Sequence, residues 1–219
     1  MSRYEKRRGG GGRTGNGILA ICLTLFIFSF SVVLVLNSRW LYYLDITLLG
    51  IEKSSGMPVA EIRANYDRLI DYNQFWYRGT LVFPTLKMSE HGAIHFAQVK
   101  RIFDVIEVGC IVTGVFSLAG IISKHRRRQY GYLKIAGVLA ITIPAVLGIL
   151  AALDWQKFFI RFHRIFFHNN YWLFDPDTDP VINILPENYF KHCAIFILAL
   201  IAAGAIVCLR MYRRRIRRQ

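Results

Sequence analysis

The chain has 219 residues, of which 54% are hydrophobic, and its formal net charge is +14. The apolar residues are gathered into uncharged blocks, several of them close to the roughly 20 residues that a helix needs to cross a bilayer. This pattern excludes an ordinary soluble domain and indicates an integral membrane protein. The charge alone would also suit a nucleic-acid-binding protein, so the placement of the basic residues has to decide between the two.

The chain starts with a basic, glycine-rich segment, 1–16, in which the glycine run at 9–12 is predicted to be flexible. The first apolar block follows at 17–36. It is longer than the apolar core of a signal peptide, which spans roughly 7 to 15 residues, and no A-x-A-like cleavage site follows it. We therefore predict that this block is a retained transmembrane helix.

The next segment, 37–103, is polar and is predicted to form short helices outside the membrane. Within it, Glu61 to Ile70 has apolar residues at helical spacing. Ser89 is predicted to cap a helix that starts at about Glu90 and continues into the second span. A complete capping box is absent, because its fourth position is occupied by Gly92.

The second predicted span, 104–123, contains one acidic residue at depth, Glu107. We expect this side chain to point toward other helices, because a carboxylate that faces lipid is costly. A short basic loop at 124–134 then leads to the third predicted span at 135–153.

A second polar segment, 154–192, precedes the fourth predicted span at 193–209 and a basic tail at 210–219. Its Asp-Pro pairs at 175–176 and 179–180 are turn signals. The whole pattern predicts an all-α integral membrane protein with four transmembrane helices and a small extracytoplasmic cap of short helices and loops, with little or no sheet.

The cysteines indicate neither a disulfide framework nor a metal site. Three of them fall inside predicted spans and one at the edge of a span, and neither a C-x-x-C pair nor a Cys/His metal pattern is present. They are Cys22, Cys110, Cys208 and Cys193. We predict that they are packing residues and that no structural disulfide forms.

The basic residues gather before the first span, between the second and third spans, and after the fourth span. These alternate segments share one side of the membrane, which the positive-inside rule makes cytoplasmic. Of the 14 acidic residues, only Glu5 falls on that side. Both termini are thus predicted to be cytoplasmic. The basic clusters are then explained by orientation and by attraction to anionic lipid headgroups, and no nucleic-acid partner is expected.

Histidines occur in both outer segments and offer candidate chemistry. His91 and His95 are four residues apart, so they lie on one face of the helix that enters the membrane. His163 follows the third span at a corresponding depth, with His168 five residues later. From the residues alone, three interpretations stay open: a zinc site, ordinary packing at the interface, or acid/base chemistry on a lipid-borne substrate.

Two stretches resemble the bacterial lipoprotein intramolecular transacylase family (Lit). The first contains NYDRLIDY and SEHGAIHFAQVKRIF, and the second is FHRIFFHNNYWLFDPDTDPVINILPENYF. The shared pattern is a Ser-Glu pair followed by a histidine and Val-Lys, then a second histidine before Asn-x-Trp, two Asp-Pro pairs and Pro-Glu. Gln98 and Gly92 depart from it, since acidic residues are expected at both positions.

The resemblance implies an enzyme that moves the sn-2 acyl chain of a diacylglyceryl lipoprotein onto the α-amino group of its N-terminal cysteine. It implies His95 and His163 as catalytic residues and a bacterial cell membrane location. Conversion of an ester to an amide is downhill, so no metal and no cofactor is expected, and the charge distribution predicts that the site is on the extracytoplasmic side. Diacylglyceryl-modified lipoproteins and membrane lipids are the expected partners. The residues expected to bind substrate or support the site are Ser89, Glu90, Asn65, Tyr66, Tyr72, Lys100, Asn170, Trp172, Asp175 and Asp179.

One alternative of a different class is a non-catalytic membrane protein whose outer cap binds a partner or assists lipoprotein trafficking. It predicts that His95 and His163 can be replaced singly as long as the protein folds. The enzyme predicts that they cannot.

Overall fold

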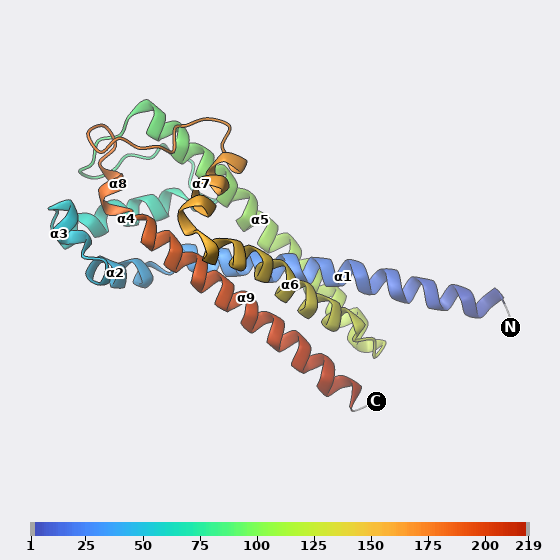
Figure 1. Cartoon of the computed structure of the whole chain (residues 1–219). Coiled ribbons are helices and arrows are strands. Elements are labelled where there is room, and N and C mark those ends of the chain that lie inside the picture. Colours follow the sequence, from blue (N-terminus) through green and yellow to red (C-terminus); the bar gives the residue numbers. More distant parts are fainter. Residues whose placement is uncertain (1–2, 218–219) are drawn as a thin grey trace. The chain divides into compact units, whose positions relative to one another are not determined.

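The computed structural model describes residues 3–217, and for residues 3–13 it describes only the backbone. Within this range the chain is helical and forms no strand, which confirms the predicted all-α class. The elements, shown in Figure 1, are α1 (Arg3–Leu36), α2 (Arg39–Leu48), α3 (Ile51–Ser55), α4 (Val59–Tyr72), α5 (Glu90–Arg126), α6 (Gly131–Leu153), α7 (Trp155–Phe166), α8 (Val181–Ile184) and α9 (Glu187–Ile216).

Four helical segments in the described range are long and apolar enough to cross a membrane, as predicted. They are Thr14–Leu36, Glu90–Arg126, Gly131–Leu153 and Glu187–Ile216. The helices are longer than the predicted spans, so the exact residues at the membrane boundaries stay a prediction. The glycine run at 9–12 belongs to α1, and its flexibility stays a prediction.

The chain divides into two compact units, and α1, α5, α6 and α9 each contribute residues to both. The first unit contains residues 3–32, 108–148 and 197–217. Its core uses small side chains that let helix backbones approach closely, since Ala20, Ala136 and Ala205 are fully buried. Gly137 meets Leu209 so closely that a Cβ at this glycine would lie 2.7 Å from the leucine side chain.

The second unit contains residues 33–107 and 149–196, and its core is aromatic. The rings of Tyr42 and Tyr66 stack with centroids 3.7 Å apart, and Tyr189 contacts both edge-on. Their hydroxyls are paired: Tyr42 donates to the carbonyl of Ile184 at 2.6 Å, and the Tyr66 and Tyr189 hydroxyls are 2.7 Å apart. These bonds join α2, α4, α8 and α9 and give each of the three tyrosine hydroxyls a partner.

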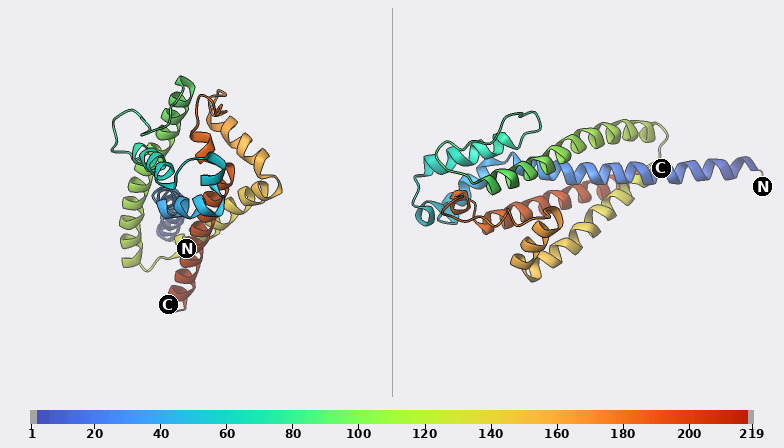
Figure 2. Two further views of the ribbon diagram at one scale, coloured as in Figure 1. Left: turned by 90° about the vertical axis from the view of Figure 1, so that its left-hand side faces the viewer. Right: turned by 90° about the horizontal axis from the view of Figure 1, so that it is seen from above.

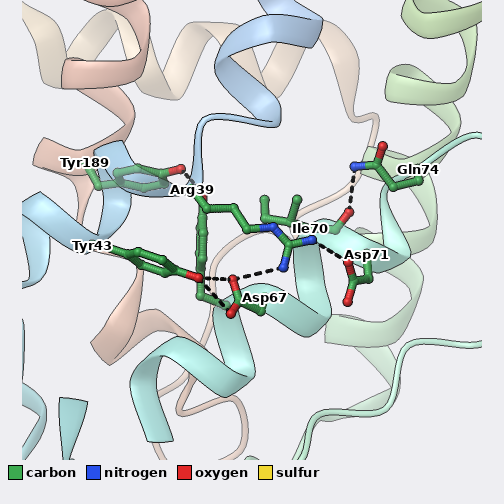
Figure 3. Close-up of polar contacts among 8 residues, drawn as sticks. Arg39, Tyr43, Asp67, Ile70, Asp71, Gln74 and Tyr189 are labelled. Carbon is green, nitrogen blue, oxygen red and sulfur yellow. Dashed lines mark hydrogen bonds and ion pairs between the residues drawn. The ribbon is translucent and has the colours of Figure 1, made fainter. Parts of the chain in front are cut away.

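An ionic network joins α2 to α4 in the same unit (Figure 3). The guanidinium of Arg39 pairs with Asp67 at 3.1 Å and with Asp71. The hydroxyl of Tyr43 donates to the Asp67 carboxylate at 2.7 Å, and Arg63 lies over the Tyr43 ring. The Arg39 and Asp67 side chains are about a third exposed, so this network fixes the register of the two helices more than it adds stability.

The loops of the second unit follow the predicted turn chemistry. The amide of Thr178 donates to the carbonyl of Asp175, and the amide of Asp177 donates to the Asp175 side chain at 2.9 Å, which closes the predicted turn. At the other end of this segment the chain turns sharply between α6 and α7 (Figure 2). The carboxylate of Asp154 caps α7 by accepting the Lys157 amide at 2.9 Å.

Candidate active site

His95 lies in the second turn of α5 and is only 6% exposed. Its ring meets the edges of Phe167 and Phe174, with centroids 4.7 Å and 5.4 Å away. Its Nδ1 is buried and has no hydrogen-bond partner among the described residues. A buried imidazole nitrogen without a partner is costly, and it leaves Nε2 as the nitrogen through which His95 can act.

His163 lies in the last turn of α7 and is oriented by its own helix. Its Nδ1 is 2.8 Å from the carbonyl oxygen of Phe159, one turn earlier. A carbonyl oxygen only accepts, so Nδ1 carries the proton and Nε2 of the neutral ring carries the lone pair. Trp172 stacks on the imidazole at 4.7 Å. Burial lowers the pKa of His163, and the bond to Phe159 offsets part of this shift.

The two imidazoles lie beside each other within the second unit. Their ring centroids are 6.1 Å apart and the ring planes are inclined by 32°. Phe167 contacts both rings, at 4.7 Å from His95 and 5.6 Å from His163. Neither ring bonds the other, so each Nε2 remains available to a group bound next to them, in surroundings made mostly of aromatic side chains.

The start of α5 is fixed by a buried carboxylate from the other loop. Asp179 is 3% exposed, and its Oδ1 accepts the amide of Ser89 at 2.7 Å. Its Oδ2 accepts the Thr178 hydroxyl at 2.8 Å. Ser89 in turn accepts the Gly92 amide at 3.0 Å, which confirms the predicted N-cap. Asp179 therefore ties the loop that follows α7 to the helix that carries His95.

The contact between Asp179 and the Ser89 amide explains why glycine occupies position 92. A Cβ built on Gly92 would overlap Oδ1 of Asp179. We expect Gly92→Ala to displace the carboxylate and to lose its bond to Ser89. A bond to a charged group contributes about 1.5–3 kcal/mol, and alanine regains about 1 kcal/mol of helix propensity. The net loss of about 1 kcal/mol should lower the thermal midpoint in detergent by a few degrees, and displacement of His95 should lower kcat about tenfold.

The matched control is Gly109→Ala in the same helix, because a Cβ at Gly109 meets nothing within 4 Å. It should leave kcat unchanged and hold or raise the thermal midpoint. If Gly92→Ala behaves like this control, Asp179 does not fix the start of α5.

The other predicted site residues lie at varying distances from the histidines. Trp172 contacts His163 directly, whereas Glu90, Asn170 and Asp175 are exposed. Four others lie in the framework around α4. Tyr66 is in the tyrosine cluster, Asn65 bonds Thr85, and Lys100 donates to the Gln74 carbonyl and to Asp104 while lying near the Tyr72 ring. These four support the fold, and their contacts do not include either imidazole.

Sequence reasoning did not single out two of the aromatic side chains that surround the histidines. Phe167 and Phe174 belong to a phenylalanine-rich stretch in which no spacing separates site residues from packing residues. Near them, the His91 ring stacks on Tyr171 at 4.1 Å, and Asn169 donates to Gln98 at 3.3 Å. Gln98 thus makes a polar contact of its own where an acidic residue was expected.

Two other predictions concern charges and metals. Glu107 is buried as predicted, and its carboxylate accepts the amide of Phe75 at 2.6 Å. The zinc interpretation of His91 and His95 lacks a ligand set, since the described part of the chain contains no group of three or more His, Cys, Asp and Glu residues arranged for a metal.

Comparison with known proteins decides the family. A family model described as Lipoprotein intramolecular transacylase Lit matches residues 17–190. The chain belongs to the Lit family. The resemblance seen in the sequence is thus confirmed, and this Lit-family chain is a membrane lipoprotein intramolecular transacylase. The enzyme class excludes the non-catalytic alternative.

Solved structures agree with the family model. The Lit-family chain is 35% identical to the membrane-integral lipoprotein intramolecular transacylase Lit from Bacillus cereus, with a TM-score of 0.93 over 96% of this chain and 98% of that one. Two variants of the same Bacillus cereus protein, with a histidine changed to arginine or to alanine, are 34% identical with TM-scores of 0.89. They cover 98% and 99% of this chain and 96% and 98% of theirs. No curated protein sequence matches the chain.

Proposed function

We propose that this enzyme moves the sn-2 acyl chain of a diacylglyceryl lipoprotein to the α-amino group of its N-terminal cysteine, and that His95 and His163 carry the reaction. The observation that supports this most directly is the pair of imidazoles, whose ring centroids are 6.1 Å apart and whose Nε2 atoms bond no described residue. The attacking amine and the ester belong to one molecule, so the product is a lyso-form lipoprotein.

The hydrogen bond at Nδ1 suggests that His163 is the base. An α-amino group has a reference pKa of about 8, so near neutral pH it is mostly ammonium and must lose a proton before it attacks. The lone pair on Nε2 of His163 is directed by the Phe159 bond and can accept that proton. The nitrogen then forms a bond to the ester carbonyl carbon and gives a tetrahedral intermediate.

His95 is proposed as the hydrogen-bond donor. With Nδ1 unpartnered, the proton of the neutral ring sits on Nε2 and can stabilise the oxygen that becomes negative. The intermediate collapses as the bond from carbon to the glyceryl oxygen breaks. Protonated His163 returns its proton to that oxygen, and the attacking nitrogen loses its second proton to water. An amide and a free sn-2 hydroxyl result, with one proton released from the original ammonium. Conversion of an ester to an amide is downhill in free energy, so the proposed step uses no cofactor.

The location is inferred from charge. The basic segments at the termini and at 124–134 favour the cytoplasmic face of a bacterial cell membrane, which puts the histidines on the extracytoplasmic side. The proposed partners there are diacylglyceryl-modified lipoproteins and the lipids around them.

The reaction can be tested in a bacterium that lacks this activity. We expect expression of the chain to convert lipoproteins to a form with an N-acylated cysteine and a free glyceryl hydroxyl, read from N-terminal lipopeptides by mass spectrometry. Well-expressed protein without acyl migration would rule the proposed reaction out. A mixture of two substrates with differently labelled acyl chains separates migration within one molecule, where labels stay together, from exchange between molecules.

The lowered pKa of His163 predicts that kcat/KM falls on the acid side at an unusually low pH. Below its pKa in the folded protein the imidazole is protonated and cannot act as a base, so kcat/KM should fall on the acid side only at a pH below the reference value of about 6.5. By linkage, the free energy of unfolding should also decrease as the pH falls from about 6.5 through this lowered pKa. Measuring kcat/KM between about pH 4 and 8 locates the limit.

The variant Trp172→Ala tests whether the acid limit of kcat/KM belongs to His163. The indole covers the imidazole, so its removal admits water and should move the acid limit up toward the ordinary histidine value. His168→Ala, at an exposed histidine of the same segment, should leave the limit in place. A limit at 6.5 or above in the wild type, unchanged by Trp172→Ala, would contradict His163 as the base.

A further inference from the structure

The helix that carries His163, α7, has three distinct sides. Successive residues are about 100° apart around a helix axis, so Phe159 and His163 share one side. This side faces the protein, since His163 stacks on Trp172 and the Phe159 ring lies 5.8 Å from that of Phe190. No residue of α7 is fully buried, so this helix lies at the surface of the second unit.

The second side of α7 is basic. Lys157, Arg161 and Arg164 are spaced by four and three residues, which places them in one stripe. All three are exposed, and Lys157 pairs with Asp154 at 2.9 Å at the helix start. Arg161 and Arg164 form no ion pair or hydrogen bond with another described side chain.

The third side is apolar and open. Phe162 and Ile165 on this side are 42% and 69% exposed, and Phe166, where it borders the side of Phe159, is 50% exposed. Leu153, which ends α6 just before α7, is 77% exposed. An apolar side next to a basic stripe, on a helix that directly follows an apolar span, is the arrangement of a helix that lies in the plane of a membrane surface.

We infer that α7 docks on anionic phospholipid, with Phe162, Ile165 and Phe166 among the acyl chains and the basic stripe on the phosphates, and that this docking holds His163 in position. The occupant must offer negative groups and hydrocarbon side by side along the helix, which an anionic bilayer surface does. The three cations complement this charge, whereas a zwitterionic surface has little net field to attract them.

The substrate itself does not explain the basic stripe. This step rests on the proposed function: a diacylglyceryl cysteine is joined through a thioether, contains no phosphate, and presents a positive α-amino group. A stripe of three cations would repel that group. The basic stripe lies about a third of a turn around the helix from His163. It therefore binds lipid phosphates on a different side of α7 from the one that carries His163.

The test compares full-length protein in nanodiscs of phosphatidylcholine with discs that contain about 30% phosphatidylglycerol. The readout is hydrogen–deuterium exchange of the amides at 155–166, which requires no catalysis. Each cation near an anionic surface strengthens the attraction about fivefold, so we expect exchange of α7 to be slowed about tenfold or more in the anionic discs. Salt at about 0.5 M should remove most of the difference.

Two triple variants with the same change of charge isolate the stripe. Lys157→Gln/Arg161→Gln/Arg164→Gln should abolish the difference between the two kinds of disc. Arg210→Gln/Arg213→Gln/Arg214→Gln, at exposed cations after the fourth span, should preserve it. Equal exchange of α7 in both discs, or slowing that persists in the α7 variant, would overturn the inference. Equal protection by a soluble polyanion in phosphatidylcholine discs would make an acidic protein the partner instead.

The same discs separate this inference from the proposed reaction. Anionic lipid should also raise kcat of the wild type, and the α7 variant should lose that gain. Protection of α7 without any acyl transfer would reject the reaction and leave the docking in place. Protection with the same kcat in both discs would reject the link between docking and His163.

Discussion

His163→Ala is expected to lower kcat for acyl migration about 10²–10⁴-fold, the range that positioned acid/base catalysis supplies. The physical reason is that alanine removes the proposed base, an imidazole whose tautomer is set by the 2.8 Å bond to the Phe159 carbonyl. Substrate binding by the acyl chains does not use this nitrogen, so KM should change little. The measurement is single-turnover conversion of a purified diacylglyceryl lipopeptide, followed by mass spectrometry.

Glutamine variants distinguish the roles of the two histidines. Gln keeps an N–H donor but cannot take up a proton near neutral pH. His95→Gln should therefore retain more activity than His95→Ala, while His163→Gln should be as slow as His163→Ala. The reverse order would exchange the two roles. A His95→Ala/His163→Ala double variant should be little slower than either single one, because residues that act as a unit are not additive.

Two histidines outside the pair serve as controls for folding and for general effects of imidazole removal. His168 is exposed and follows His163 by five residues, and His91 is exposed one turn before His95. We expect His168→Ala and His91→Ala to keep kcat within about twofold of the wild type. A loss at His163 no larger than at His168 would contradict the proposed mechanism.

The fold was predictable because its signals are local. Four apolar blocks and the charges between them predict four spanning helices, and Ser89 in front of Glu90 marks the start of α5. The approach of His95 to His163 was also expected, from their similar depth near two spans. These inferences use spacing and hydropathy, which a sequence displays directly.

The contacts that hold the site together are not local, and the sequence could not predict them. Asp179 reaches the Ser89 amide across 90 residues, and only the absence of a Cβ at Gly92 permits that approach. In the sequence, Gly92 is merely a departure from a family pattern. Asn65 and Tyr66 show the converse, because they belong to the quoted family stretch yet bond within the framework.

A second joint of this kind, absent from the sequence prediction altogether, lies between α2 and α9. Asp45 is 1% exposed, and both of its carboxylate oxygens face Nδ1 of His192, at 2.8 Å and 2.9 Å. The residues are 147 positions apart. His192 donates through Nδ1, and no other described side chain bonds the Asp45 carboxylate.

His192→Phe should therefore be among the most destabilising single changes in the second unit. It leaves a buried carboxylate without a partner, which costs about 3–5 kcal/mol. For a chain of this size, that loss lowers the thermal midpoint by about 10 °C. Circular dichroism in detergent measures it, and His91→Phe at an exposed histidine provides the matched control.

The double variant Asp45→Leu/His192→Phe determines what the pair contributes. If the cost comes from the stranded carboxylate, replacing both partners by apolar side chains should recover most of the lost stability, because a buried ion pair and a packed apolar pair of similar volume are often nearly equal. A double variant as unstable as His192→Phe would instead show that the hydrogen bond between the two side chains itself fixes α2 against α9. In that case the α2 contacts of the tyrosine cluster would also depend on Asp45.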